Sequence, residues 1–88
     1  MKVIVFSSVD CSACKTMKQS ILTIQERNGF DLEEYFVEEN LETFRKYGVD
    51  MTPVCVVVDD NDKEVGRFIG HQTEISAENS LRKYGVIE

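Results

Sequence analysis

The sequence predicts an α/β fold in which a four-stranded mixed sheet is flanked by three helices. Two continuous apolar runs, within residues 2–6 and 54–58, are typical of strands buried on both faces. Apolar residues recur at helical spacing between residues 11 and 28. The elements alternate as strand, helix, strand, helix, strand, strand, helix, which predicts a right-handed βαβ unit followed by a hairpin.

Local signals define the first half of the chain. After the strand at residues 2–6, the helix expected over residues 11–28 has an apolar face formed by Cys14, Met17, Ile21 and Ile24. Asn28-Gly29 is a typical helix end. Residues 32–38 are an expected edge strand, because acidic residues flank its apolar centre. Asn40 is expected to cap a short helix that ends before Gly48 and carries Leu41, Phe44 and Tyr47.

The second half begins with Pro53, which directly precedes the strand expected at residues 54–58. The run Asp59-Asp60-Asn61-Asp62 is a turn by composition. Val65–Ile69 is a strand that contains Gly66 and Arg67, so an edge position is expected. Thr73 is expected to cap the last helix, which ends at Gly85 and carries Ile75, Leu81 and Tyr84.

Composition and charge limit the class of protein. The chain has 88 residues, 42% hydrophobic and 30% charged, which predicts one soluble globular domain spanning residues 1–88. A net charge of −6 argues against a nucleic-acid partner. The N-terminal apolar run is too short for a signal peptide or a membrane span. Three cysteines, an odd number, argue against a disulfide-stapled secreted scaffold, so we expect a cytoplasmic protein without a membrane partner.

Two cysteines, Cys11 and Cys14, stand where the first strand gives way to the first helix. The unpaired amide groups of a helix N-terminus stabilise a thiolate, so Cys11 is expected to be the nucleophile. Cys14 lies on the apolar helix face and should keep its proton longer, which predicts the role of resolving cysteine. The residues expected to tune the thiolate are Asp10, Ser12, Ala13 and Lys15. Lys15 is equally well explained as an ordinary solvated lysine.

The pair can exchange electrons through a disulfide or hold a soft metal. Cβ atoms three residues apart on a helix are separated by about 5–6 Å, whereas a disulfide prefers about 3.5–4.5 Å. Closing the bond therefore requires a local adjustment and should leave it readily reduced. A structural zinc site needs four ligands, and only Cys55 and His71 remain. We expect Cys55 to pack as a small apolar residue, and His71 to lie in a surface loop or at the rim of the site.

A copper-chaperone-like domain also begins its first helix with two cysteines at this spacing. Such a domain usually carries a methionine two residues before the first cysteine, where this chain has Val9, and it ends on a strand rather than a helix. A soft-metal carrier or a non-catalytic binding module nevertheless stays as an alternative of another class.

Three motifs give the chain a resemblance to the thioredoxin/glutaredoxin superfamily over nearly its whole length. They are Cys11-Ser12-Ala13-Cys14, Thr52-Pro53 at the start of the third strand, and Gly70 at the end of the fourth. The segment 45–53 is also similar to the thioredoxin segment that leads into its cis-proline. The resemblance implies a thioredoxin fold, a cis Thr52–Pro53 bond beside the cysteines, and an extended substrate segment pairing with the backbone there. The implied substrate-binding residues are Met51, Thr52, Pro53, Ile69 and Gly70.

The chain also departs from the usual motifs of the superfamily that it resembles. It has no tryptophan, and Ser12-Ala13 matches neither the Gly-Pro of thioredoxins nor the Pro-Tyr of glutaredoxins. Val5 stands where thioredoxins place a buried aspartate that accepts a proton. The Gly-Gly and acidic signature that binds glutathione in glutaredoxins is reduced to the segment 70–74.

Together these features predict a thiol–disulfide oxidoreductase that reduces protein disulfides as a monomer and binds no cofactor. The resemblance implies that a thioredoxin-reductase-like flavoenzyme using NADPH recharges it, and that ribonucleotide reductase is a candidate substrate. A glutathione-dependent, glutaredoxin-like oxidoreductase is the alternative within the same class.

Overall fold

The computed structural model describes residues 1–88 and has the predicted order of elements. The strands are β1 (Lys2–Ser7), β2 (Asp31–Phe36), β3 (Val54–Val58) and β4 (Glu64–Ile69). The helices are α1 (Ser12–Asn28), α2 (Leu41–Lys46) and α3 (Glu74–Lys83).

The strands form one mixed sheet in the order β2-β1-β3-β4. β1 pairs with β2 in parallel, whereas β1 with β3 and β3 with β4 are antiparallel. The two apolar strands occupy the centre and the two charged strands the edges, which confirms the expectation from the sequence. Val5 of β1 consequently lies between Glu34 of β2 and Cys55 of β3 in the sheet register.

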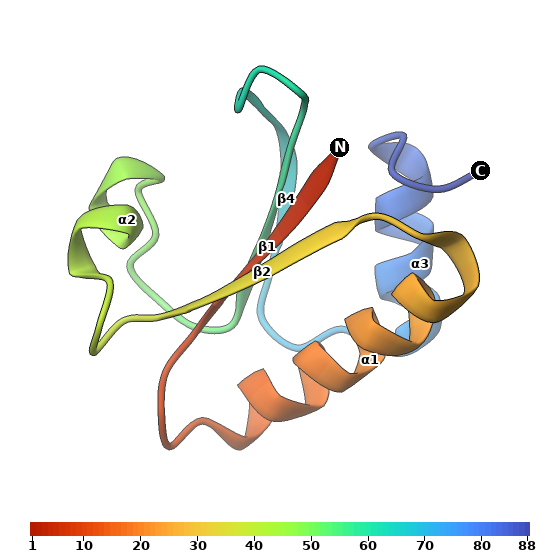
Figure 1. Cartoon of the computed structure of the whole chain (residues 1–88). Coiled ribbons are helices and arrows are strands. Elements are labelled where there is room, and N and C mark those ends of the chain that lie inside the picture. Colours follow the sequence, from red (N-terminus) through yellow and green to blue (C-terminus); the bar gives the residue numbers. More distant parts are fainter.

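Helices cover both faces of the sheet (Figure 1). α1 and α3 pack on one face, where the buried side chains include Val5, Met17, Ile21 and Leu81. α2 lies on the other face, where Phe6 meets Phe44 edge to face with ring centres 4.9 Å apart. The alternation of side chains along β1 separates these two cores, because successive residues point to opposite faces.

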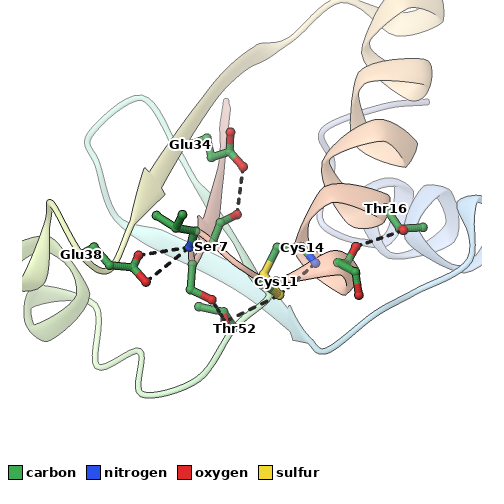
Figure 2. The surroundings of a disulfide bond; sticks show 10 residues. Ser7, Cys11, Cys14, Thr16, Glu34, Glu38 and Thr52 are labelled. Carbon is green, nitrogen blue, oxygen red and sulfur yellow. Dashed lines mark hydrogen bonds between the residues drawn. A yellow bond between two sulfur atoms is a disulfide. The ribbon is translucent and has the colours of Figure 1, made fainter.

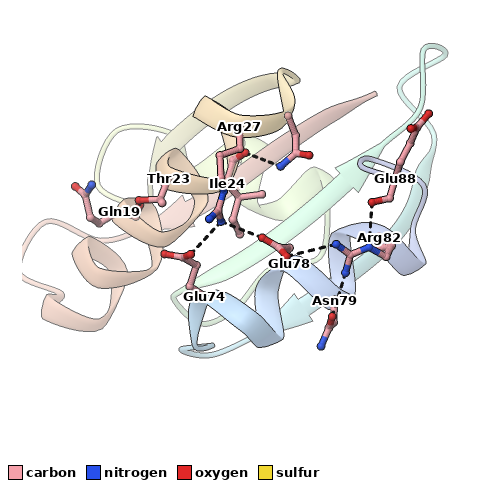
Figure 3. Close-up of polar contacts among 10 residues, drawn as sticks. Gln19, Thr23, Ile24, Arg27, Glu74, Glu78, Asn79, Arg82 and Glu88 are labelled. Atoms are coloured by element: carbon pink, nitrogen blue, oxygen red, sulfur yellow. Dashed lines mark hydrogen bonds and ion pairs between the residues drawn. The ribbon is translucent and has the colours of Figure 1, made fainter.

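An ion-pair network ties the two helices of the first face together (Figure 3). The Arg27 guanidinium lies 3.0 Å from a Glu74 carboxylate oxygen and 2.9 Å from one of Glu78. These side chains are partly exposed, so the network contributes little to stability.

Most ends of the elements follow the predictions, but the cap of α2 and the end of β2 differ from them. Thr73 caps α3 as expected, accepting a hydrogen bond from the Ser76 amide at 3.1 Å. Asn40 stands at the N-cap of α2, but its side chain accepts no capping bond and donates instead to the Phe36 carbonyl. The strand expected over residues 32–38 ends at Phe36, because the amides of Glu39 and Asn40 turn back to that same carbonyl.

Gly66 in β4 has a packing reason that the sequence did not reveal. A Cβ atom at this position would overlap carbons of the Tyr84 ring. The Tyr84 hydroxyl donates to the Arg67 carbonyl at 3.0 Å, which holds the ring across the strand. The glycine therefore lets the chain end after α3 pack onto β4.

Candidate active site

Cys11 and Cys14 form a disulfide at the start of α1, with their Cα atoms 5.2 Å apart (Figure 2). Cys11 lies before the helix rather than inside it: it is the N-cap residue, with extended backbone angles of φ −107° and ψ 103°, and α1 begins at Ser12. The Cys11 sulfur accepts a hydrogen bond from the Cys14 amide at 3.1 Å. The extended residue supplies the local adjustment that closing the bond requires.

The two cysteines differ in their exposure. Cys14 is only 1% exposed and belongs to the buried face of α1, together with Met17 and Ile21. Cys11 is half-buried, on the outer side of the pair. An incoming sulfur therefore reaches Cys11 before it reaches Cys14.

Thr52 approaches the disulfide from the segment that precedes β3. Its hydroxyl donates to the Cys11 sulfur at an oxygen-to-sulfur distance of 4.0 Å, and the Ser8 hydroxyl lies 3.1 Å from the same Thr52 oxygen. The Thr52–Pro53 peptide bond is cis. The buried Pro53 accepts a hydrogen bond on its carbonyl from the Gly70 amide at 2.8 Å, so the ends of three segments meet beside Cys11.

The remaining predicted residues lie around this meeting point. Met51 and Ile69 are exposed apolar side chains next to Thr52 and Gly70, and Val9, in the loop before Cys11, is exposed as well. Asp10, Ser12 and Lys15 are also exposed, whereas Ala13 is half-buried. Neither Asp10 nor Lys15 takes part in an ion pair.

The other two candidate residues stand apart from the disulfide. Cys55 is completely buried in β3, and this burial raises the pKa of its thiol to about 12. His71 is exposed in the segment after Gly70. No three side chains of the kinds that bind metals come together anywhere in the structure. None of the helices has the length and apolar character needed to cross a bilayer.

The structure adds polar residues that the sequence analysis did not select. The Glu38 carboxylate accepts hydrogen bonds from the Val9 amide at 3.2 and 3.3 Å and so holds the loop before Cys11. Glu34 accepts from the Ser7 hydroxyl at 2.9 Å and from the Lys18 ammonium group at 2.8 Å (Figure 2 shows the Ser7 contact). The sequence signal that could have identified Glu34 is the period of a strand. Residues two apart share a face, so Glu34 lies on the same face of β2 as Leu32 and Phe36, the face covered by α1.

The fold and the disulfide support membership of the general class of thiol–disulfide oxidoreductases. The model of the thioredoxin-like domain family matches residues 1–85. The chain therefore belongs to the thioredoxin-like family, as its motifs indicated.

Solved structures agree with this assignment. Thioredoxin 1 from the thermophilic eubacterium Thermosipho africanus is 28% identical, with a TM-score of 0.83 over 96% of this chain and 93% of that one. A mutant thioredoxin from Halobacterium salinarum is 23% identical, with a TM-score of 0.85 over 94% of this chain and 73% of that one. A thioredoxin pre-protein from Schistosoma mansoni is 24% identical, with a TM-score of 0.83 over 94% and 77%. No curated protein sequence matches the chain.

Proposed function

We propose that this protein is a reductant of protein disulfides that works through the Cys11–Cys14 pair. The observation that carries the proposal is the asymmetry of the pair: a half-buried sulfur held at a helix N-terminus is bonded to a sulfur that is 1% exposed. In the reduced protein the helix N-terminus favours the thiolate of Cys11, which makes Cys11 the nucleophile.

The reaction takes two sulfur exchanges. The Cys11 thiolate attacks one sulfur of a substrate disulfide, a Cys11–substrate bond forms, and the other substrate sulfur leaves as a thiolate. Cys14 then loses its proton and attacks the Cys11 sulfur, which releases the second substrate sulfur. The substrate gains two electrons, and the protein is left with the Cys11–Cys14 disulfide described above.

The surface beside Cys11 is suited to an extended substrate segment. Its exposed apolar side chains are Val9, Met51 and Ile69. Main-chain groups of Thr52 and the approach over Gly70, which has no side chain, offer pairing to the substrate backbone. The Thr52 hydroxyl, which donates to the Cys11 sulfur, can stabilise the Cys11 thiolate once the protein is reduced.

The source of electrons in this proposal is a thioredoxin-reductase-like flavoenzyme that uses NADPH, with ribonucleotide reductase among the candidate acceptors. The protein would act as a single thioredoxin-like domain and a cytoplasmic monomer, without a bound cofactor. Glutathione is the alternative reductant, and the soft-metal carrier is the alternative of another class.

A coupled assay tests the proposal. The oxidised protein is incubated with NADPH and either thioredoxin reductase or glutathione plus glutathione reductase, and reduction of a protein disulfide such as that of insulin is followed. We expect turnover with thioredoxin reductase and little with glutathione. Turnover in neither system, together with tight copper or zinc retention by the reduced protein, would favour the metal carrier instead.

A further inference from the structure

A cavity of about 440 Å³ opens beside Cys14, between α1 and β2. Four charged side chains line it together with the Cys14 side chain: Lys15, Lys18, Glu34 and Glu39. The cavity is large enough to hold several water molecules, because one water needs only about 30 Å³. It therefore connects an otherwise buried thiol to groups that can carry a proton.

Glu34 is the carboxylate that the structure holds most firmly in this cavity. Its side chain is 19% exposed, and it accepts hydrogen bonds from Lys18 at 2.8 Å and from the Ser7 hydroxyl at 2.9 Å. Glu39 lines the same cavity but is exposed to solvent. On the neighbouring strand, the position paired with Glu34 is the apolar Val5, which can accept no proton.

The resolving step requires such a group. Cys14 attacks as a thiolate, yet its side chain is 1% exposed, so its proton leaves by way of the cavity that Cys14 borders. Four charged groups line the cavity of Cys14. Lys15 and Lys18 come from α1, Glu34 comes from β2, and Glu39 follows β2 in the chain. Lys15 and Lys18 are cations and cannot accept a proton.

We propose that Glu34 is the proton acceptor for Cys14. As Cys14 attacks the Cys11 sulfur and the bond from Cys11 to the substrate breaks, the Cys14 proton passes through water in the cavity to the Glu34 carboxylate. When a reductant later breaks the Cys11–Cys14 bond, a proton returns to the Cys14 sulfur by the same route through the cavity. The inference rests on the proposed function, because it concerns the second sulfur exchange of the same pair.

Replacing Glu34 by glutamine should change the rate of the resolving step in opposite directions, depending on whether Glu34 takes the proton or acts only through its charge. This difference makes the proposal testable. A nearby carboxylate disfavours the Cys14 thiolate, and Glu34→Gln also frees Lys18, whose charge then favours it. If Glu34 acts only as a charge, its replacement by glutamine should speed the resolving step. If Glu34 takes the proton, the same replacement should slow it.

The experiment uses stopped-flow mixing of the reduced full-length protein with one equivalent of the aromatic disulfide DTNB. The attack by Cys11 releases one coloured thionitrobenzoate, and the attack by Cys14 on Cys11 releases the second, so two phases separate the two steps. We expect Glu34→Gln to slow the second phase at least about tenfold at neutral pH and to leave the first unchanged. A positioned general base typically contributes about 10²–10⁴-fold to a rate, and we expect the low end of that range because water in the open cavity can also take the proton.

Glu39→Gln is the matched control, because it removes a carboxylate from the same cavity: it should leave the first phase unchanged and should not slow the second. An unchanged or faster second phase in Glu34→Gln, or equal slowing of both phases, overturns the inference. If Glu34→Gln does not fold, Glu34→Asp replaces it: the shortened carboxylate should give an intermediate second phase, and wild-type speed overturns the inference. A wild-type protein without a second phase overturns the proposed function itself.

Discussion

Cys14 and Cys55 are buried to nearly the same degree, 1% and 0% exposed, yet their surroundings give them different chemistry. Cys55 lies in the centre of the sheet, with Val5 and Phe68 as its register neighbours, and its pKa rises to about 12 because burial disfavours the thiolate. Cys14 is bonded to a more exposed sulfur and borders a cavity with charged walls. The exposed fraction alone therefore does not separate the two thiols: a partner sulfur and a cavity with charged walls make Cys14, and not Cys55, suited to thiol exchange.

The largest expected effects come from removing one thiol at a time. Cys14→Ser should accumulate mixed disulfides with substrate proteins, because the resolving attack is lost, and Cys11→Ser should trap none. Cys55→Val, the control from the core, should turn over like the wild type. Non-reducing electrophoresis and mass spectrometry after incubation with a protein disulfide measure all three, and equal trapping by Cys11→Ser contradicts the assignment of roles.

A second prediction separates stability from chemistry. Gly66→Ala places a methyl group inside the Tyr84 ring contact and should lower the free energy of unfolding by about 2 kcal/mol. The two thiol-exchange phases of the folded protein should keep their rates, because the change lies away from both cysteines of the pair. In the Tyr84→Ala variant, Gly66→Ala should lower the free energy of unfolding by less than it does in the wild type. If the loss is the same in both, this double-mutant cycle shows that the Tyr84 ring does not cause the destabilisation.

The pKa of Cys55 predicts a loss of stability in alkali. The thiol titrates at about 12 in the native protein and near its ordinary value of 9.0 when unfolded. Between those values the unfolded state holds fewer protons, so native stability falls by up to about 1.4 kcal/mol per pH unit as the pH rises. Urea unfolding of the oxidised protein near pH 8 and near pH 10 should show a shallower loss for Cys55→Val than for the wild type. Equal losses would mean that Cys55 is not the group responsible.

The smallest predicted effect tests the Cys11 side of the pair. Thr52→Val removes the hydroxyl that donates to the Cys11 sulfur at 4.0 Å. A long bond to sulfur is worth at most about 1 kcal/mol, and the higher nucleophilicity of a more basic thiolate offsets part of its loss, so the first DTNB phase should slow about twofold at neutral pH. The second phase, which belongs to Cys14, should change less. Thr52→Ser keeps the hydroxyl and serves as the control; slowing by serine as large as by valine would point to packing instead.

Much of this architecture could be predicted from the sequence because its signals are local. The short apolar runs that form β1 and β3 are rich in β-branched residues, which favours buried strands, and the spacing from Cys14 to Ile24 is that of one helical face. The position of the cysteine pair at the start of α1 followed from the same patterns.

The parts that were missed depend on contacts between distant segments. Glu34 belongs to an acidic run along the chain, and only the pairing of β2 with β1 brings it beside Ser7 and the cavity of Cys14. Asn40 has the side chain of a cap, but the Phe36 carbonyl engages its amide group. Cys11 looked like a first-turn residue because helical periodicity does not define where a helix starts to within one residue.

The hydrogen bond from the Cys14 amide to the Cys11 sulfur has a consequence for how partners distinguish the two redox states. The same amide can serve a disulfide sulfur and a free thiolate, so the start of α1 need not rearrange when the pair is reduced. We expect the oxidised and reduced molecules to have nearly the same shape and to differ chiefly by a negative charge at one point. A reductase and a substrate would then distinguish the oxidised from the reduced protein by its electrostatic potential rather than by shape complementarity.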